Sequence, residues 1–169
     1  MFVATKYTAE HVANKLYQSG VYATAFHGEL SQGARQTVLQ EFKDKRWQVL
    51  VTTDLAARGI DIAQLPAVVN YDLPRATADY IHRIGRTGRA GESGEAISMV
   101  TPAALAHWAL IEKREQLRVP LEELEDFPVT EAVPLLADTS GNGGIKGKRP
   151  SKKDKLRAAA QQADGETPQ

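Results

Sequence analysis

The sequence predicts an α/β fold organised around a mostly parallel β-sheet. Short apolar runs of strand length alternate along the chain with longer segments in which apolar residues recur every three or four positions. The run 48–53 is apolar until it ends in two threonines, as is typical of a central strand covered on both faces. At 169 residues with 42% hydrophobic residues, the chain is long enough to bury a core of its own.

Helix start and stop signals divide the chain between the strands. Thr8 can cap a first helix that Gly20 stops, Ser31 can cap a second, and Thr77 begins a short third one. A fourth helix is expected over residues 103–117. The expected strands cover residues 2–5, 21–26, 48–53, 67–71 and 95–100.

Three loops follow the carboxyl ends of expected strands: residues 27–32, 52–61 and 71–74. Parallel α/β sheets bind their ligands on such loops, so these segments are the expected site of function. The third helix leads from the last of these loops to an arginine-rich segment, residues 82–91.

Residues 82–91 hold one histidine and three arginines, interrupted by glycines. Arg83 can pair with Asp79 one helical turn earlier, whereas the helical neighbours of Arg86 are cationic or neutral. Because each glycine weakens a helix by about 1 kcal/mol, the segment is expected to project its guanidiniums from a turn. Guanidinium suits phosphate oxygens, which predicts a polyphosphate or a nucleic-acid backbone as the partner. On composition alone, a solvated basic loop is an equal alternative.

The composition argues against several classes of protein. Lys+Arg and Asp+Glu number 21 each, so no overall positive field indicates nucleic-acid binding. Cysteine is absent and the four histidines are scattered, so no metal site is expected. No apolar run approaches the roughly 18 residues of a membrane span, and no leader peptide is visible. These features predict a cytoplasmic protein that is monomeric and has no membrane partner.

The chain changes character after residue 120, so residues 1–120 are the expected folded domain. Residues 121–138 are acidic and contain proline, as in a linker or a wrapping segment. Residues 139–169 have few apolar residues and are expected to form a disordered basic tail. Within them, residues 145–157 hold seven bases and one acid. Such a run is either a solvated tail or a source of salt-dependent affinity for a phosphate backbone.

Five short motifs in one order make the chain resemble the DEAD-box RNA helicases. Residues 82–91 resemble motif VI, residues 53–61 motif V and residues 2–6 motif IV. Between motifs IV and V lie His27-Gly28-Glu29, Gln32 and Arg35, and the stretch 70–74 completes the order. Histidine at position 82 favours the DEAD-box group over related groups that carry glutamine there.

The resemblance covers about residues 2–118 and implies a three-layer RecA-like domain, the second of the two that form a DEAD-box helicase. It implies that Arg86 and Arg89 reach the γ-phosphate of ATP as arginine fingers. It also implies that Asp61 accepts a hydrogen bond from the ribose and that Gly59 lets the backbone approach the nucleotide. For Asp61, a helix or turn cap is the alternative.

Two further residues of motif VI are expected to couple the domain interface to the nucleotide: His82 and Arg83. The alternative for His82 is a satisfied histidine at a helix end. Arg83 has a structural alternative through its pairing with Asp79.

The resemblance assigns RNA phosphates to Thr5, Arg35, Thr53 and the backbone around Gly28. Hydroxyl, guanidinium and amide groups recognise a backbone and carry no base information, so RNA binding is expected to be independent of sequence. The alternatives are threonines satisfied by their neighbours and an exposed arginine. No array of aromatic residues for base stacking is expected in these loops, and the nearby aromatics are assigned to the core or its margin: Tyr7, Tyr22, Phe26 and Phe42.

Neither a phosphate-binding P-loop nor an Asp-Glu-Ala-Asp magnesium motif occurs in the sequence. Residues 141–149 are rich in glycine and lysine but lack the first glycine and the hydroxyl that a P-loop requires. The chain is therefore expected to serve as the carboxyl-terminal motor domain of an ATP-dependent RNA helicase, and to be inactive alone. ATP and Mg²⁺ would be held by an amino-terminal domain. A non-catalytic module that binds RNA or another protein is the alternative, and an inert fragment is a weaker one.

Overall fold

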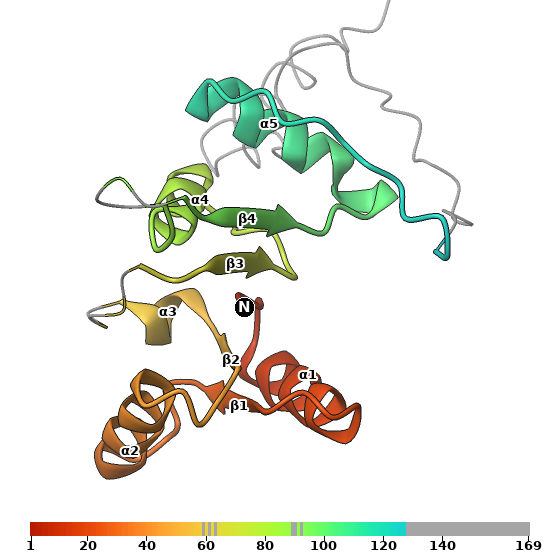
Figure 1. Ribbon diagram of the computed structural model, residues 1–169. Coiled ribbons are helices and arrows are strands. Elements are labelled where there is room, and N and C mark those ends of the chain that lie inside the picture. Colours follow the sequence, from red (N-terminus) through yellow and green to blue (C-terminus); the bar gives the residue numbers. More distant parts are fainter. Residues whose placement is uncertain (59, 61, 63, 89–90, 92, 128–169) are drawn as a thin grey trace, which may run out of the picture. The chain divides into compact units, whose positions relative to one another are not determined.

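The computed structural model describes residues 1–127 except 59, 61, 63, 89, 90 and 92 (Figure 1). Its elements are α1 (Lys6–Gln18), β1 (Ala23–Phe26), α2 (Gln32–Lys43), β2 (Val49–Thr52), α3 (Asp54–Ala57), β3 (Ala67–Asn70), α4 (Thr77–Ile84), β4 (Glu95–Ser98), a short 3-10 turn η1 (Pro102–Ala104) and α5 (Leu105–Glu115). The predicted α/β fold is confirmed. The predicted tail 139–169 and most of the predicted linker 121–138 lie outside the described residues.

The strands form one parallel arrangement that the start of the chain holds together. β1 pairs with β2 and β3 pairs with β4, both in parallel. Phe2 bridges the two pairs, because it pairs with Thr52 on one side and with Asn70 on the other. Its amide donates to the Val69 carbonyl at 2.7 Å, and the Val3 amide donates to the Thr52 carbonyl at 2.9 Å. The strand order is therefore β1, β2, Phe2, β3 and β4, as the stacked strands of Figure 1 show.

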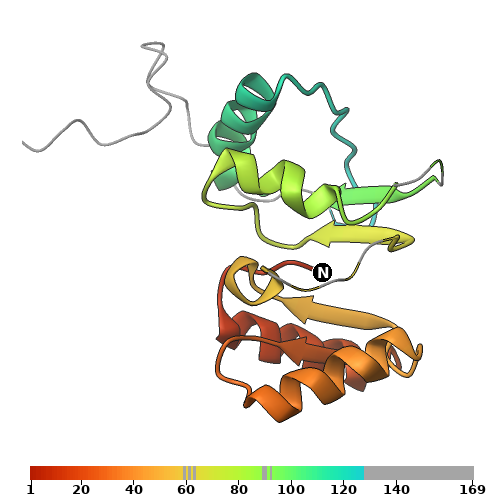
Figure 2. The ribbon, with the colours of Figure 1, turned by 90° about the vertical axis from the view of Figure 1, so that its left-hand side faces the viewer.

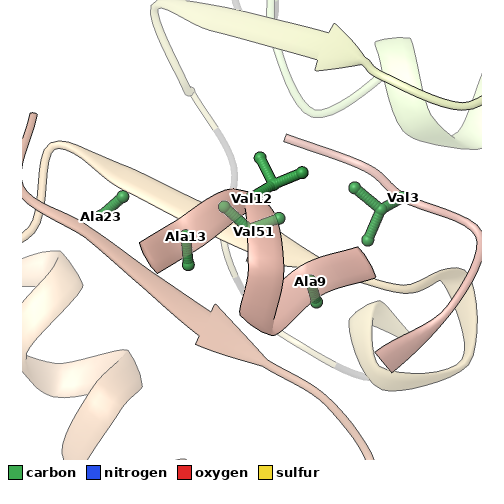
Figure 3. Packing of buried hydrophobic residues seen from close by; sticks show 6 residues of the cluster. All are labelled: Val3, Ala9, Val12, Ala13, Ala23 and Val51. Carbon is green, nitrogen blue, oxygen red and sulfur yellow. The ribbon is translucent and has the colours of Figure 1, made fainter. Parts of the chain in front are cut away.

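Helices cover both faces of these strands. In Figure 1, α1 lies on one side of β1 and β2, while α2 and α3 lie on the other. Val51 of β2 faces α1 and packs in a cluster drawn in Figure 3: Val3, Ala9, Val12, Ala13, Ala23 and Val51. Its neighbour Leu50 points to the opposite face, where it packs with Phe26, Ala56 and apolar residues of α2. This two-sided burial explains why consecutive residues in the middle of the predicted central strand are apolar.

A third cluster joins the last two helices. Tyr80 of α4 packs against Trp108 and Ile111 of α5, with the Tyr80 and Trp108 rings edge-to-face at 5.4 Å. The two helices lie side by side in both views of the ribbon (Figure 2). Packing against α5 therefore holds α4 in place. This helix contains the first residues of the arginine-rich segment. None of the helices in the described residues is long and apolar enough to cross a lipid bilayer.

The first helix begins earlier than predicted. Thr5, and not Thr8, is the N-cap of α1, because the Thr5 hydroxyl accepts a hydrogen bond from the Thr8 amide at 3.1 Å. The predicted strand 2–5 is therefore reduced to the bridging residue Phe2. A helix start three residues upstream was hidden because both threonines are suitable caps.

The prediction that Tyr7 and Tyr22 lie in or near the core is wrong. Their relative exposures are 71% and 57%. Phe26 is buried as predicted, and Phe42 packs against the cluster around it.

The buried Met1 amino group makes the free energy of unfolding depend on pH. It donates to the Leu50 carbonyl at 2.8 Å, and burial, with a smaller effect from the charge of Arg83, lowers its pKa from 8.0 to about 6. Between pH 6 and 8 the unfolded chain therefore binds more protons than the folded one, so stability rises with pH. For a chain with a free Met1 amine, we expect the free energy of unfolding to rise by about 2 kcal/mol over this window.

Urea denaturation at pH 6 and pH 8 measures this change. The matched control is the same chain acetylated at Met1, which keeps every histidine but has no titrating amine. An equal pH dependence in both chains would contradict the prediction.

Candidate functional site

Arg83 is the best-connected side chain at the carboxyl ends of the strands. Only 2% of its side chain is exposed. Two of its guanidinium nitrogens donate to the Asp54 carboxylate, at 2.6 and 2.7 Å. The third nitrogen donates to the Asn70 side-chain oxygen at 3.0 Å and to the Asp72 carbonyl at 2.6 Å. A two-pronged contact of this kind suits the planar guanidinium. Arg83 therefore ties the loops after β2 and β3 to α4.

The predicted pairing of Arg83 with Asp79 is wrong. Arg83 shares the buried face of α4 with Thr77 and Tyr80, spaced three residues apart, whereas Asp79 lies on another face. Its carboxylate partner is Asp54, the first residue of α3. The acid of this ion pair is 29 positions away in sequence, which helical spacing does not reveal.

A cavity of about 170 Å³ opens beside this network. Its lining residues come from the start of the chain, from α3 and the residue after it, and from α4 and the turn that follows: Phe2, Asp54, Ala57, Arg58, Asp79, His82, Arg83 and Arg86. Charged and polar side chains predominate in this lining. We name this space the arginine pocket.

Two basic side chains of the arginine pocket lie near one carboxylate, that of Asp79, and a third, Arg86, lies apart from it. Arg58 lies 3.6 Å from Asp79, and the His82 ring lies 3.8 Å from the same carboxylate oxygen. The Arg86 guanidinium donates to the Ile60 carbonyl at 3.2 Å, and no carboxylate of the described residues lies within ion-pair distance of it. Two arginines and a histidine against one acid suit an anion with several oxygens. No role was predicted for Arg58 from the sequence, although it lies in the predicted functional loop after β2.

A second, larger hollow of about 200 Å³ lies along β2 and β3. Its lining is mostly aliphatic and aromatic, with Arg86 as its one charged residue among those the structure describes. The described residues of its lining do not include the converging polar groups that orient a nucleotide. We therefore place the candidate site at the arginine pocket.

Three of the predicted nucleotide residues lie outside the described residues: Gly59, Asp61 and Arg89. Of the predicted arginine fingers, Arg86 lines the arginine pocket. His82 also lines it and is 77% exposed at its side chain.

The four predicted RNA residues fall into two pairs. Thr5 and Gly28 are both exposed, and their sequence neighbours Lys6 and Glu29 form an ion pair. Thr53 and Arg35 meet at Ala56, whose amide donates to the Thr53 hydroxyl at 3.4 Å and whose carbonyl accepts from Arg35 at 3.3 Å.

Three of the four predicted RNA residues also have structural contacts. Thr5 and Thr53 cap α1 and α3, and the Arg35 guanidinium stacks on the Phe26 ring at 4.7 Å. The Thr53 hydroxyl accepts its capping bond and keeps its proton for a ligand, whereas the Thr5 hydroxyl also shares a 2.8 Å hydrogen bond with the Thr8 hydroxyl. In the part of the chain that the structure describes, no three acidic, histidine or cysteine side chains gather as a metal site.

Comparison with known proteins agrees with this arrangement. Residues 1–91 match the family described as the helicase conserved C-terminal domain. The ATP-dependent RNA helicase eIF4A of Lodderomyces elongisporus is 43% identical over 113 residues, which are 67% of this chain and 28% of that protein. The RNA helicase CrhR of Synechocystis is 48% identical over 102 residues, or 60% of this chain and 21% of that protein.

Solved structures give the same result. The carboxyl-terminal domain of the DEAD-box protein Dbp5 is 43% identical with a TM-score of 0.63, covering 68% of this chain and 67% of that one. A DEAD-box protein from Methanococcus jannaschii is 42% identical with a TM-score of 0.66, covering 69% and 32%.

The chain spans only 21% to 28% of the length of these two curated relatives. The matched family covers more than half of the chain, and the fold is that of the second RecA-like domain. The chain therefore belongs to the helicase carboxyl-terminal domain family, as a member of its DEAD-box RNA helicase group.

Proposed function

We propose that this chain is the carboxyl-terminal motor domain of an ATP-dependent DEAD-box RNA helicase. The observation that carries the proposal is the arginine pocket, where Arg58, His82 and Arg86 converge at the carboxyl ends of the strands. Such a pocket binds an anion but has no P-loop to hold a nucleotide by itself. The phosphates would be presented by a partner domain that also holds Mg²⁺.

Arg86 and Arg89 are the proposed arginine fingers. Guanidinium groups stabilise the charge that spreads over the phosphoryl oxygens when the terminal phosphate of ATP is transferred. Among the described residues, the Arg86 guanidinium makes one hydrogen bond, to the Ile60 carbonyl, and phosphate oxygens can replace this weak contact. Gly59 and Asp61, in the same loop as Ile60, are the proposed contacts to the ribose side of ATP.

Thr5, Gly28, Arg35 and Thr53 are the proposed RNA contacts. They follow the bridging segment, β1 and β2, or begin α2, so they share one edge of the sheet. Because they offer hydroxyl, amide and guanidinium donors to phosphates, binding would be independent of sequence.

Arg83 is the proposed link between the RNA and ATP contacts. Its partner Asp54 adjoins Thr53, and its partner Asp72 also accepts the Ala4 amide at 2.7 Å, next to Thr5. A shift of an RNA-contacting loop would therefore move Arg83 and with it α4. This helix contains His82 and leads to Arg86. His82, exposed on the pocket rim, is the proposed contact to the partner domain.

A non-catalytic module that binds RNA or another protein is the second candidate. It is favoured by the absence of a P-loop from the sequence. In either case we propose a monomeric, cytoplasmic protein of three parts: a folded domain over residues 1–120, a linker over 121–138 and a basic tail over 139–169.

Reassembly of the helicase separates the two candidates. The chain is mixed with a separately made amino-terminal DEAD-box domain, and RNA-stimulated ATPase activity is measured. Activity that needs both parts supports the motor domain. RNA binding by the chain without any ATPase activity in the mixture would support the module instead.

Gly28 provides a direct test of the RNA contact. A methyl group added at Gly28 meets no atom within 4 Å, and its backbone does not require glycine. Gly28→Ala is therefore expected to leave the free energy of unfolding unchanged, while it lowers RNA affinity about 3- to 10-fold because it blocks close approach of the backbone.

Gly33→Ala in α2 is the matched control, since a methyl group there also meets nothing. It should not change RNA affinity as measured by fluorescence anisotropy. If both variants bind RNA with the affinity of the wild type, Gly28 does not contact the RNA.

A further inference from the structure

The first turn of α1 carries a charged and an aromatic side chain that the proposed RNA site does not use. The Lys6 ammonium contacts the Glu29 carboxylate and lies 4.7 Å from the centre of the Tyr7 ring. Tyr7 is 71% exposed, so its ring is largely uncovered by protein atoms. Lys6, Tyr7 and Glu29 thus form a small surface cluster.

This cluster lies between two proposed RNA contacts. Lys6 and Tyr7 directly follow Thr5, the N-cap of α1, and Glu29 directly follows Gly28. An RNA strand that contacts Thr5 and Gly28 therefore passes beside Glu29. A carboxylate there repels phosphate unless a cation neutralises it, and Lys6 does so in the absence of RNA.

The Lys6–Glu29 ion pair is exposed enough for a ligand to replace one of its partners. The Lys6 side chain is 31% exposed and that of Glu29 is 65% exposed. Their hydrogen bond raises the pKa of the Lys6 ammonium and lowers the pKa of the Glu29 carboxyl, so both are charged at neutral pH. Exposed ion pairs contribute little to stability, so exchange of Glu29 for a phosphate oxygen costs the fold little.

The Tyr7 ring is suited to a base. Exposed aromatic rings beside a phosphate-binding groove bind single-stranded nucleic acid by stacking, which tolerates any base. Lys6 now lies close to this ring, and its movement toward a phosphate would leave the ring to the base.

We propose that Lys6 and Tyr7 form a one-nucleotide subsite for RNA, in which Lys6 binds the phosphate, Tyr7 stacks on the base, and Glu29 competes with the phosphate for Lys6. The inference rests on the proposed function, because it takes the RNA path past Thr5 and Gly28 as given. It adds a base contact and an intramolecular competitor to a path otherwise made of backbone contacts.

The test is binding of the whole chain to a fluorescent uridine oligonucleotide, measured by anisotropy at several salt concentrations. Glu29→Gln is expected to raise affinity about 2- to 5-fold, because it releases Lys6. Lys6→Gln is expected to lower affinity and to reduce the salt slope by about 0.7, the value for one phosphate of a single strand. A gain of affinity is a result that simple damage to the fold does not give.

Stacking is tested separately. Tyr7→Leu is expected to lower affinity for the uridine oligonucleotide about fivefold or more, and Tyr7→Phe to restore it, because the ring alone is needed. On an oligonucleotide of the same length without bases, wild type and Tyr7→Leu should bind equally. Lys15→Gln and Tyr17→Leu, exposed positions farther along α1, are the controls and should match the wild type.

The possible results separate this inference from the function on which it rests. If wild type binds and Arg35→Gln weakens binding, but the Lys6, Tyr7 and Glu29 variants behave as the controls do, the subsite is refuted and the proposed function stands. If wild type binds no RNA, either alone or mixed with the amino-terminal domain and ATP, both are refuted. If Glu29→Gln weakens binding as Lys6→Gln does, the pair orders the loops and the proposed competition is wrong.

Discussion

Replacing Arg86 with alanine is expected to lower the RNA-stimulated ATPase rate of the reassembled helicase by about 10³-fold or more. The same loss is expected for Arg89→Ala. An arginine finger acts on charge that develops only in the transition state, so kcat should fall much more than the affinity for ATP. Among the described residues, the Arg86 side chain makes one weak hydrogen bond, to the Ile60 carbonyl, so the free energy of unfolding should change by about 1 kcal/mol or less.

Arg75→Ala is the matched control for this loss, because Arg75 is an exposed arginine outside the arginine pocket. Arg86→Lys keeps the charge but loses the planar fork, and should recover only part of the rate. Steady-state ATPase assays at saturating RNA measure all four variants. An Arg86→Ala enzyme with a normal kcat would show that the pocket cation serves the fold and not the reaction.

The largest loss of stability is expected for Arg83→Leu, about 3–5 kcal/mol. The substitution leaves Asp54 without its partner and removes the donors to Asn70 and to the Asp72 carbonyl. Asn70 is fully buried, so its side-chain oxygen would lose its bond without access to water. Urea denaturation monitored by tryptophan fluorescence measures the change.

Two comparisons make this prediction specific. Arg58→Leu breaks an exposed ion pair at 3.6 Å and should cost less than about 1 kcal/mol. The double variant Arg83→Leu/Asp54→Leu should be more stable than Arg83→Leu alone, because it removes the uncompensated carboxylate. A loss for Arg83→Leu no greater than for Arg58→Leu would contradict the assigned role of the buried pair.

The fold could be predicted because local signals agreed with one another. The run 48–53 is apolar on both faces, and the structure places Leu50 and Val51 in separate clusters on opposite sides of the sheet. Where two signals competed, the prediction failed: Thr5 and Thr8 are equally good caps, and only the packed structure selects Thr5. Tyr7 and Tyr22 were misplaced because an aromatic residue beside an apolar run has no local feature that tells burial from exposure.

The site was predictable as a set of loops, but not as a set of contacts. The rule that ligands bind at the carboxyl ends of parallel strands located the segments that line the arginine pocket. The partner of Arg83 could not be predicted, since helical spacing offered Asp79, and Asp54 comes close only when β2 and α4 are assembled. For the same reason no role could be predicted for Arg58 or for the Lys6–Glu29 pair, whose members are 23 positions apart.

The Arg83 network also limits how this domain can be recombined with its relatives. A chimera that joins residues 1–70 of one protein to the remainder of another separates Arg83 from Asp54, which meet only after folding. Grafted halves should therefore fold well only when the donor supplies an acid at position 54 and the acceptor an arginine at position 83.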